Sequence, residues 1–178
     1  ESQDNIAKVI VIENPKVFYQ MGEELEHLVL NEECSWMVSE NDGTKLSPSK
    51  IDVIYTPFNI ELNSKKILNK IYKDIDDEIN QNLFSDKELI TSFILKLFET
   101  ASQNLFYNLE YNFECDFKDI LKTFQVKLAC ECTGLLEKLV EYVKILNEVC
   151  GIECIFFINL KNYLDKDELK MLYKEAFY

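Results

Sequence analysis

The 178-residue chain contains no arginine, and it has only four glycines and one histidine. All 19 basic side chains are therefore lysines, which lack the planar fork that grips phosphate or guanine through two hydrogen bonds. The sequence also lacks the G-x-x-x-x-G-K-[ST] motif of phosphate-cradling loops. These absences exclude an arginine finger and an ordinary P-loop nucleotidase, and they leave single ammonium charges as the means of contacting phosphate.

The sequence gives little indication of catalysis by an imidazole or a thiol. His27 lies between Glu26 and Leu28 on a predicted helix, a position typical of the surface or the edge of a core. Six cysteines occur without Cys-x-x-Cys spacing, and several lie in apolar runs, as reduced thiols of cytosolic proteins do: Cys34, Cys115, Cys130, Cys132, Cys150 and Cys154. The sequence therefore indicates no catalytic histidine or cysteine.

The charge balance is strongly acidic, with 32 acidic side chains against 19 lysines and a net charge of −13. This total argues against a generally sticky basic protein, although local potential rather than net charge governs binding. Long apolar runs are also missing, since none approaches the roughly 20 residues that span a bilayer. With 47% apolar residues the chain can build a packed core, and we expect a cytoplasmic protein without membrane contact.

Strand-like and helical segments alternate along much of the sequence. Short β-branched or apolar runs predict strands at residues 8–13, 34–38, 51–55, 126–130 and 153–159, and turn residues between the second and third allow a hairpin. Helical spacing is found at residues 15–30, 134–149 and from 165 onward, with a short helix ending at 124. The alternation predicts an α/β fold with a mostly parallel sheet, whose strand at 154–158 is covered by helices on both faces.

Two long amphipathic helices interrupt this alternation. The first begins at Lys65, and the second opens at Asp86 after the short connection 81–85. Long helices joined by a short turn are expected to lie antiparallel. The sequence therefore predicts a protruding helical hairpin, or leg, at residues 61–110, and an α/β head made of residues 1–60 and 111–178.

Several charged clusters are candidates for binding. Lys65, Lys66, Lys70 and Lys73 share one helix start, and they form either a solvated face or a stripe that tracks phosphates. Acidic residues from 110 to 119 lie where the leg re-enters the head, and such oxygens suit a hard cation such as Ca²⁺. The acidic run at residues 74–78 is typical of a solvated helix face.

Scattered motifs, taken together in their order and spacing, resemble a known family. They are residues 9–13 followed by 17–18; 63–64 with 67–68; 109–111 followed by 119–122 and 126–127; 137–138; and 155–159 followed by 163–164 and 166–168. From residue 8 to about 174 the chain resembles the accessory protein of type II-A CRISPR systems that takes part in spacer acquisition, a ring-shaped binder of DNA ends.

The resemblance implies a head related to P-loop ATPase folds without the nucleotide motif, together with a helical leg. It further implies a homotetrameric ring whose lysine-lined channel holds double-stranded DNA ends without reading sequence. Calcium would stabilise the ring, no catalysis is expected, and the partners would be the CRISPR integrase proteins and the type II effector nuclease.

The resemblance also points to particular residues. Lys122, Lys127 and Lys138 stand where relatives carry basic residues, so they are the first candidates for the channel. The four lysines of residues 65–73 lack that positional match and join them only as a local cluster. Glu110 matches an acidic stretch of the family, and Glu114 and Asp116 replace further carboxylates after a one-residue shift. These three acids are the candidate calcium ligands.

Two other functions compete with DNA binding. One is an acidic protein–protein interaction adaptor that does not contact DNA. The other is a degenerate nucleotide hydrolase with a phosphate loop at residues 13–16, where proline and an acidic residue stand in place of glycines and donors.

Overall fold

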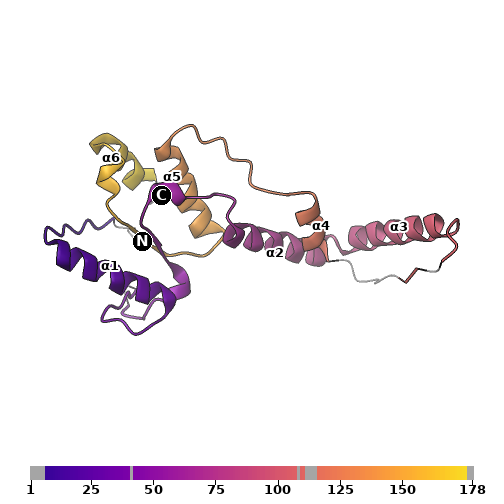
Figure 1. Cartoon of the computed structure of the whole chain (residues 1–178), viewed down its shortest axis with the longest axis horizontal. Helices are drawn as coiled ribbons and strands as arrows, with labels where there is room; N and C mark the ends of the chain where they lie inside the picture. Colours follow the sequence, from indigo (N-terminus) through magenta and orange to yellow (C-terminus); the bar gives the residue numbers. More distant parts are fainter. Residues whose placement is uncertain (1–6, 41, 108, 111–115, 176–178) are drawn as a thin grey trace. The chain divides into compact units, whose positions relative to one another are not determined.

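The computed structural model describes residues 7–40, 42–107, 109–110 and 116–175 (Figure 1). The chain divides into two compact units. Glu1–Leu62 and Ala129–Tyr178 form one, which we call the α/β unit, and Asn63–Leu128 form the other, the helical unit. The sequence-based domain limits, after residues 60 and 110, stay a prediction.

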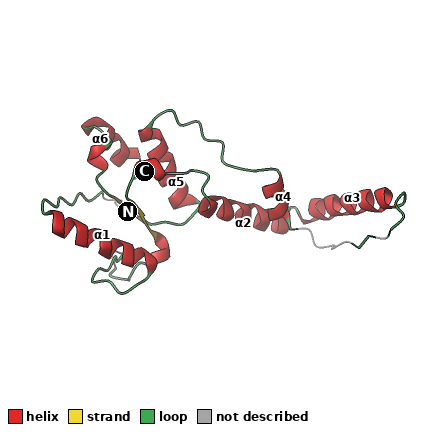
Figure 2. Ribbon diagram, in the orientation of Figure 1, coloured by secondary structure: helices red, strands yellow, loops and turns green. Residues whose placement is uncertain are grey.

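The described residues are mostly helical, with a small sheet (Figure 2). The helical unit contains α2 (Lys65–Asn82), α3 (Phe84–Ser102) and α4 (Phe117–Thr123). The α/β unit contains α1 (Pro15–Leu30), β1 (Ile51–Ile54), α5 (Leu135–Glu148), β2 (Cys154–Phe157) and α6 (Lys166–Glu175), with short 3-10 turns at Pro48–Lys50, Pro57–Asn59 and Leu160–Asn162.

Local sequence signals explain where the helices of the α/β unit begin. The side-chain oxygen of Asn14 accepts hydrogen bonds from the amides of Lys16 (2.9 Å) and Val17 (3.4 Å), and Pro15 occupies the first helical position of α1. Ahead of α6, Asp165 accepts from the amide of Glu168 while Glu168 accepts from that of Asp165, both at 2.9 Å. This reciprocal pair is a capping box. The expected helices at 15–30 and from 165 are therefore confirmed.

The sheet of the described residues consists of β1 and β2, which pair in parallel with Ile51 opposite Cys154. Alternate residues of β2 pack into two different hydrophobic clusters, so they lie on opposite faces. One cluster contains Leu25 and Leu28 of α1, and the other contains Leu139 of α5 with Leu169 and Leu172 of α6. Helices thus cover both faces, as the sequence predicted for an α/β fold.

The strand expected at residues 8–13 is not formed. The segment is coil, and Val9, Ile10 and Val11 are 55%, 63% and 70% exposed. β-branched residues favour a pleated surface only where a neighbouring strand completes the hydrogen-bond ladder. Within the described residues this run has no such partner, so its strand propensity is not realised.

The predicted hairpin between residues 34–38 and 51–55 is also not formed, so this prediction is wrong. The chain does turn where turn residues were found, because the amide of Gly43 donates to the carbonyl of Glu40 and Gly43 has a φ of 86°. The returning segment, however, is residues 44–46, and Ser39 forms an isolated antiparallel bridge with Lys45. β1 instead pairs with β2, and each pair of residues that lie opposite one another is 103 positions apart in the sequence.

The strand expected at residues 126–130 is replaced by a different set of hydrogen bonds. The Val126 carbonyl accepts from the Tyr72 hydroxyl at 2.7 Å. The Leu128 amide donates to the side chain of Asn63 at 2.8 Å, and the Leu128 carbonyl accepts from it at 3.2 Å. Because side chains of α2 and its N-terminal flank satisfy this backbone, the segment needs no strand ladder.

The antiparallel helical hairpin is not seen among the described residues. A single residue, Leu83, separates α2 from α3, and its amide donates to the carbonyl of Ile79 while its carbonyl accepts from the amide of Lys87. Leu83 itself is not helical (φ −123°, ψ 28°), so the two helices are distinct, and α3 runs on beyond the end of α2 instead of folding back (Figure 1). None of the helices in the described ranges is both long and apolar enough to cross a membrane.

Candidate nucleic-acid interface

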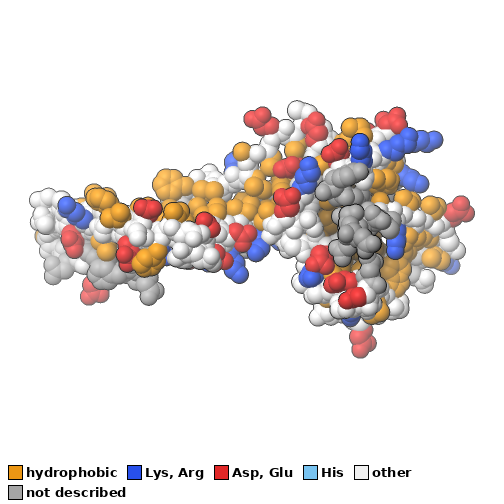
Figure 3. All heavy atoms as spheres, turned by 180° about the vertical axis from the view of Figure 1, so that it is seen from behind, with side chains coloured by type: hydrophobic (Ala, Val, Ile, Leu, Met, Phe, Trp, Pro, Cys, Tyr) orange, Lys and Arg blue, Asp and Glu red, His pale blue; other side chains and the backbone are white. Residues whose placement is uncertain are grey.

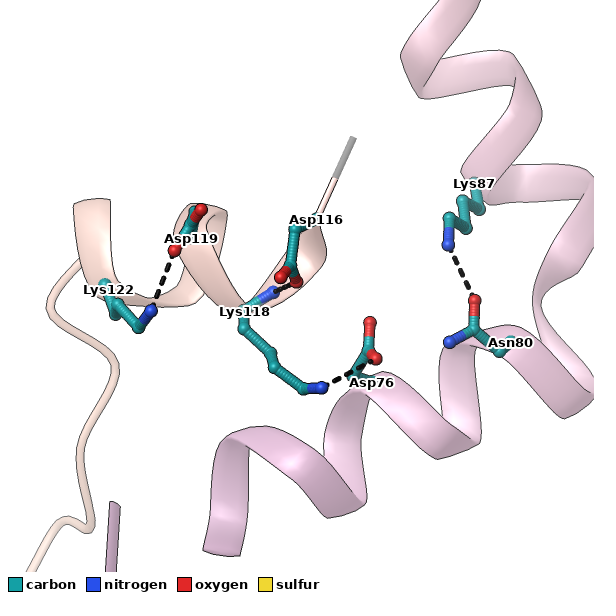
Figure 4. Close-up of polar contacts among 7 residues, drawn as sticks. All are labelled: Asp76, Asn80, Lys87, Asp116, Lys118, Asp119 and Lys122. Atoms are coloured by element: carbon teal, nitrogen blue, oxygen red, sulfur yellow. Dashed lines mark hydrogen bonds and ion pairs between the residues drawn. The ribbon is translucent and has the colours of Figure 1, made fainter. Parts of the chain in front are cut away.

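The helical unit holds α4 against α2 through an ion pair. Lys118 Nζ lies 3.4 Å from the Asp76 carboxylate, whose side chain is only 14% exposed (Figure 4). At the start of α4, Asp116 acts as the N-cap and accepts from the Lys118 amide at 2.8 Å. The orientation of α4 on α2 is thereby defined by contacts at its first turn.

The backbone on either side of Lys127 is attached to the same helix region. Val126 is held by the Tyr72 hydroxyl and Leu128 by the Asn63 side chain. These bonds join residues 54 and 65 positions apart. Lys127 itself is exposed between the two attachment points, so its backbone is fixed while its side chain is left to solvent.

Lys122 projects from the last turn of α4. Its Nζ donates to Asp119 at 2.8 Å, and it is exposed (Figure 4). The hydrogen bond and the charge of Asp119 raise the pKa of Lys122 above its ordinary value, and Asp116 and Tyr72 act in the same direction. Lys122 therefore remains an ammonium at any physiological pH.

The lysines of α2 occupy its first half. Lys65, Lys66 and Lys73 are exposed, and Lys70 donates to Asp74 at 3.0 Å. Residues 65–73 contain these four lysines and no acidic residue. Together with Lys122 and Lys127, they are carried by a frame made of α2, α4 and residues 126–128, which we call the lysine frame.

Charge is unevenly divided between the two units. The helical unit has nine lysines and eleven acidic residues, a net charge of −2. The α/β unit has ten lysines and 21 acidic residues, a net charge of −11. The acidic excess of the sequence therefore belongs almost entirely to the α/β unit, and the lysine frame lies in the nearly neutral part of the chain.

The structure adds two lysines that the sequence reasoning did not single out. Lys118 lies four residues before Lys122 on α4, a spacing that places both on one side of a helix and was available as a signal. Lys87 at the start of α3 donates to the Asn80 side chain at 2.6 Å and lies 5.5 Å from the centre of the Phe117 ring. Lys138, by contrast, is half-buried on α5 in the α/β unit.

The candidate calcium ligands are only partly described. Glu114 lies outside the described residues, Glu110 is exposed in a loop, and one oxygen of Asp116 already accepts from the Lys118 amide. Among the described residues, no three histidine, cysteine, aspartate or glutamate side chains gather as metal ligands would. Calcium takes six to eight oxygens, so the described residues do not by themselves compose a calcium site.

In the proposed phosphate loop at residues 13–16, the backbone amides that would bind a phosphate already donate to a side chain of the same segment. Asn14 accepts from the Lys16 and Val17 amides, which are the donors that a phosphate at this helix start would use. A phosphate would have to displace a side chain that caps α1. The arrangement suits helix initiation better than nucleotide binding.

Comparisons with a family model and with known proteins point to the same family. A family model described as CRISPR-associated protein (Cas_Csn2) matches residues 30–178. "CRISPR-associated protein Csn2" of Enterococcus faecalis is 27% identical over 133 residues, which cover 71% of this chain and 58% of that protein. The protein of the same name from Streptococcus agalactiae is 22% identical over 170 residues, with 92% and 73% covered.

A solved structure has a similar fold. The crystal structure of Stu0660 of Streptococcus thermophilus matches with a TM-score of 0.60 at 13% identity, covering 93% of this chain and 57% of that chain. The chain thus spans little more than half the length of the E. faecalis and S. thermophilus proteins. Because the family model matches residues 30–178, most of the sequence, the chain belongs to the Csn2 family of CRISPR-associated proteins.

Proposed function

We propose that the protein binds double-stranded DNA ends, without catalysis and without reading sequence, inside the lysine-lined channel of a homotetrameric ring. In this role it supports spacer acquisition during CRISPR adaptation in the bacterial cytoplasm. The observation that carries the proposal is the lysine frame, in which six candidate lysines share one set of mutually attached elements in the nearly neutral unit. Lys138 is added to it from the family resemblance.

The chemistry of the frame suits phosphates rather than bases. An ammonium group is a point charge without the fixed fork that reads guanine, so lysine contacts neutralise phosphates and carry no sequence information. Each phosphate contact releases counterions, and affinity for duplex DNA therefore falls steeply as salt rises. A closed ring around the duplex explains a requirement for ends, because a duplex must be threaded into it.

The exposed side of α3 supports self-association. Leu89, Phe93 and Leu97 are 55%, 68% and 65% exposed, and they recur at the spacing of one helix face. Hydrophobic side chains are visible along this part of the helical unit (Figure 3). An apolar helix face of this size is expected to be covered by protein, and a further copy of the chain satisfies that requirement in a homotetramer.

The threading mechanism is tested by comparing duplexes that differ only in having ends. In a gel-shift assay at about 50 mM salt, we expect the linear duplex to bind and the covalently closed circle of the same sequence to remain free. Cutting that circle once should restore binding. Equal binding to both forms contradicts threading, and binding to neither favours the alternative function, an acidic interaction adaptor without DNA contact.

Calcium binding is proposed from the family resemblance, with Asp116 as the described residue best placed to test it. Asparagine caps helices as well as aspartate does, so Asp116→Asn should keep the α4 cap and remove only the charge. We expect Ca²⁺ to raise the melting temperature and the fraction of tetramer of the unaltered protein but not of this variant. Thermal unfolding and light-scattering mass, each with and without Ca²⁺, measure the two effects.

The matched control for this test is Asp77→Asn, which removes the same charge from the exposed side of α2. It should respond to Ca²⁺ as the unaltered protein does. If Asp116→Asn also responds fully, Asp116 is not a ligand. If none of the three proteins responds, the calcium proposal is wrong for this chain.

Two further parts of the proposal rest on the resemblance to the family. The integrase proteins and the type II effector nuclease are the proposed partners during adaptation. A relation of the α/β unit to P-loop ATPase folds is proposed as well, and the parallel pairing of β1 and β2 with helices on both faces is compatible with it.

A further inference from the structure

The α/β unit contains a cavity of about 460 Å³ that the proposed function does not use. It lies among residues 129–132, α5 and α6. Leu136, Val140 and Met171 supply apolar lining from the two helices. The volume falls in the range of about 300–1,000 Å³ that is usual for sites that bind small ligands.

Most of the remaining lining is acidic. Glu131, Glu137, Glu141 and Glu175 contribute carboxylates, and the described residues that line the cavity include no lysine. Glu137 is already committed, because its carboxylate accepts from the Thr133 amide and hydroxyl, both at 2.8 Å, and these bonds lower its pKa. It is therefore ionised at neutral pH and contributes a fixed negative charge.

This combination excludes some ligands and favours one class. Carboxylates repel phosphate, so the cavity is unsuited to DNA, and the unit around it carries a net charge of −11. An apolar lining with an acidic rim complements a cation that carries an apolar stem or neighbours. Lysine and arginine side chains within an apolar peptide segment have this character.

We propose that this cavity is a docking site for a basic peptide segment of a partner protein. A lysine or arginine head would lie against Glu131, Glu141 or Glu175, and the apolar neighbours of that residue would pack on Leu136, Val140 and Met171. The site is separate in sequence from the lysine frame, so the six lysines of the frame can contact duplex DNA while the cavity holds a basic protein segment.

A metal is a poorer occupant of the same cavity. The thiols of Cys130 and Cys132 line it, and burial raises the pKa of Cys130, with further contributions from Glu141 and Cys132. A protonated thiol is a weak ligand, and thiolate is the form that binds metals. No group of three or more histidine, cysteine or carboxylate ligands is found in the described part of the chain.

The two thiols make occupancy measurable. We expect the amidated peptide Leu-Lys-Leu-Arg-Leu, at saturation, to slow alkylation of Cys130 and Cys132 by N-ethylmaleimide about tenfold or more at about pH 8.5, where thiols ionise. Cys34 lies outside the cavity lining and serves as the internal reference in the same mass-mapped digest. The peptide with glutamate in place of lysine and arginine should give no protection.

A pair of charge reversals on one helix tests the acidic rim. Glu141→Lys should weaken peptide protection about tenfold or more, whereas Glu148→Lys, exposed on the same helix but outside the cavity, should leave it unchanged. Glu141→Gln keeps the shape of the side chain and provides a second variant if the reversal does not fold. Because loss of Glu141 lowers the pKa of Cys130, labelling without peptide speeds up, and each variant is compared with its own peptide-free rate.

Three results overturn the proposal. Equal protection by the acidic peptide means that charge does not select the occupant. Equal protection by spermidine means that the cavity takes bare polyvalent cations instead of a peptide. Unchanged protection in both Glu141 variants means that the acidic rim does not hold the basic residue. Each of these outcomes leaves the DNA assay unaffected, so failure of the two proposals can be told apart.

Discussion

Replacing Lys122, Lys127 and Lys138 together by glutamate should abolish the gel shift of linear duplex at low salt. The three substitutions lower the net charge of each chain by six units. Electrostatic attraction to phosphates supplies nearly all of sequence-independent DNA binding. Lys122 and Lys127 are exposed on elements attached to α2, and Lys138 is half-buried on α5, so none of the three substitutions falls in the buried core. Circular dichroism and thermal unfolding should show that the variant is folded.

The matched control reverses Lys45, Lys161 and Lys166, which are exposed lysines of the α/β unit. It carries the same change of net charge and should bind duplex within a few-fold of the unaltered protein. If the control loses binding equally, net charge rather than the candidate lysines governs affinity. If the first variant binds normally, these three residues do not line the channel.

A milder series gives a quantitative version of the same prediction. Lys122 is paired with Asp119, so a glutamate there creates a repulsion that glutamine avoids. In the triple glutamine variant, the slope of log affinity against log salt should fall by about one for each lysine that contacts a phosphate. An unchanged slope would show that these lysines make no phosphate contacts.

Leu139→Ala should lower the free energy of unfolding of the α/β unit by about 2–5 kcal/mol. Leu139 is fully buried on α5 and belongs to the cluster that covers one face of the sheet, with Ile54, Leu164 and Leu172. Truncation removes the buried isopropyl end of the side chain and leaves a cavity that its neighbours fill only in part. This is the largest single-residue effect on stability that we expect.

Trp36 provides the probe for this measurement. It is the one tryptophan of the chain, and it packs against the cluster on the opposite face of the same sheet. Urea unfolding followed by its fluorescence therefore reports on the α/β unit. Leu30→Ala, at a residue 60% exposed, is the control and should change the free energy of unfolding by less than about 0.5 kcal/mol. Equal effects of the two variants would place Leu139 outside the stabilising core.

Local features of the fold could be read from the sequence. The helix that follows Asn14 and Pro15, and the capping box of Asp165 and Glu168, depend on hydrogen bonds between residues at most three positions apart. Their energies are set by neighbours in the chain and are nearly independent of the rest of the molecule. The helices of residues 15–30 and 166–175 were predictable for this reason.

Strands were less predictable, because their stability depends on a distant partner. Residues 51–54 and 154–157 are less obviously strand-like than the β-branched run at 8–13, yet the former pair and the latter does not. Pairing is selected by the two helix layers that bury both faces of β1 and β2. Sequence pattern measures propensity for a strand, but it does not show which segments meet.

The direction of a chain after a short break is a further tertiary property. Helical spacing predicted both α2 and α3, but it is the backbone conformation of Leu83, between them, that directs the second helix beyond the end of the first. The large apolar face of α3 fits either a hairpin or an exposed surface, so composition alone does not distinguish them.

By itself, the sequence determined the acidic total, the lysine-only basic chemistry, the helices with strong caps and the family to which the chain belongs. Only the tertiary structure decided that Lys122 and Lys127 share a frame with the lysines of α2, that the acidic excess lies in the other unit, and that four glutamates surround one apolar cavity. The physical reason is the separation along the chain between the residues that interact. Caps and helical stripes arise from interactions within a few residues, whereas the lysine frame depends on Tyr72 and Asn63 binding backbone groups 54 and 65 positions away.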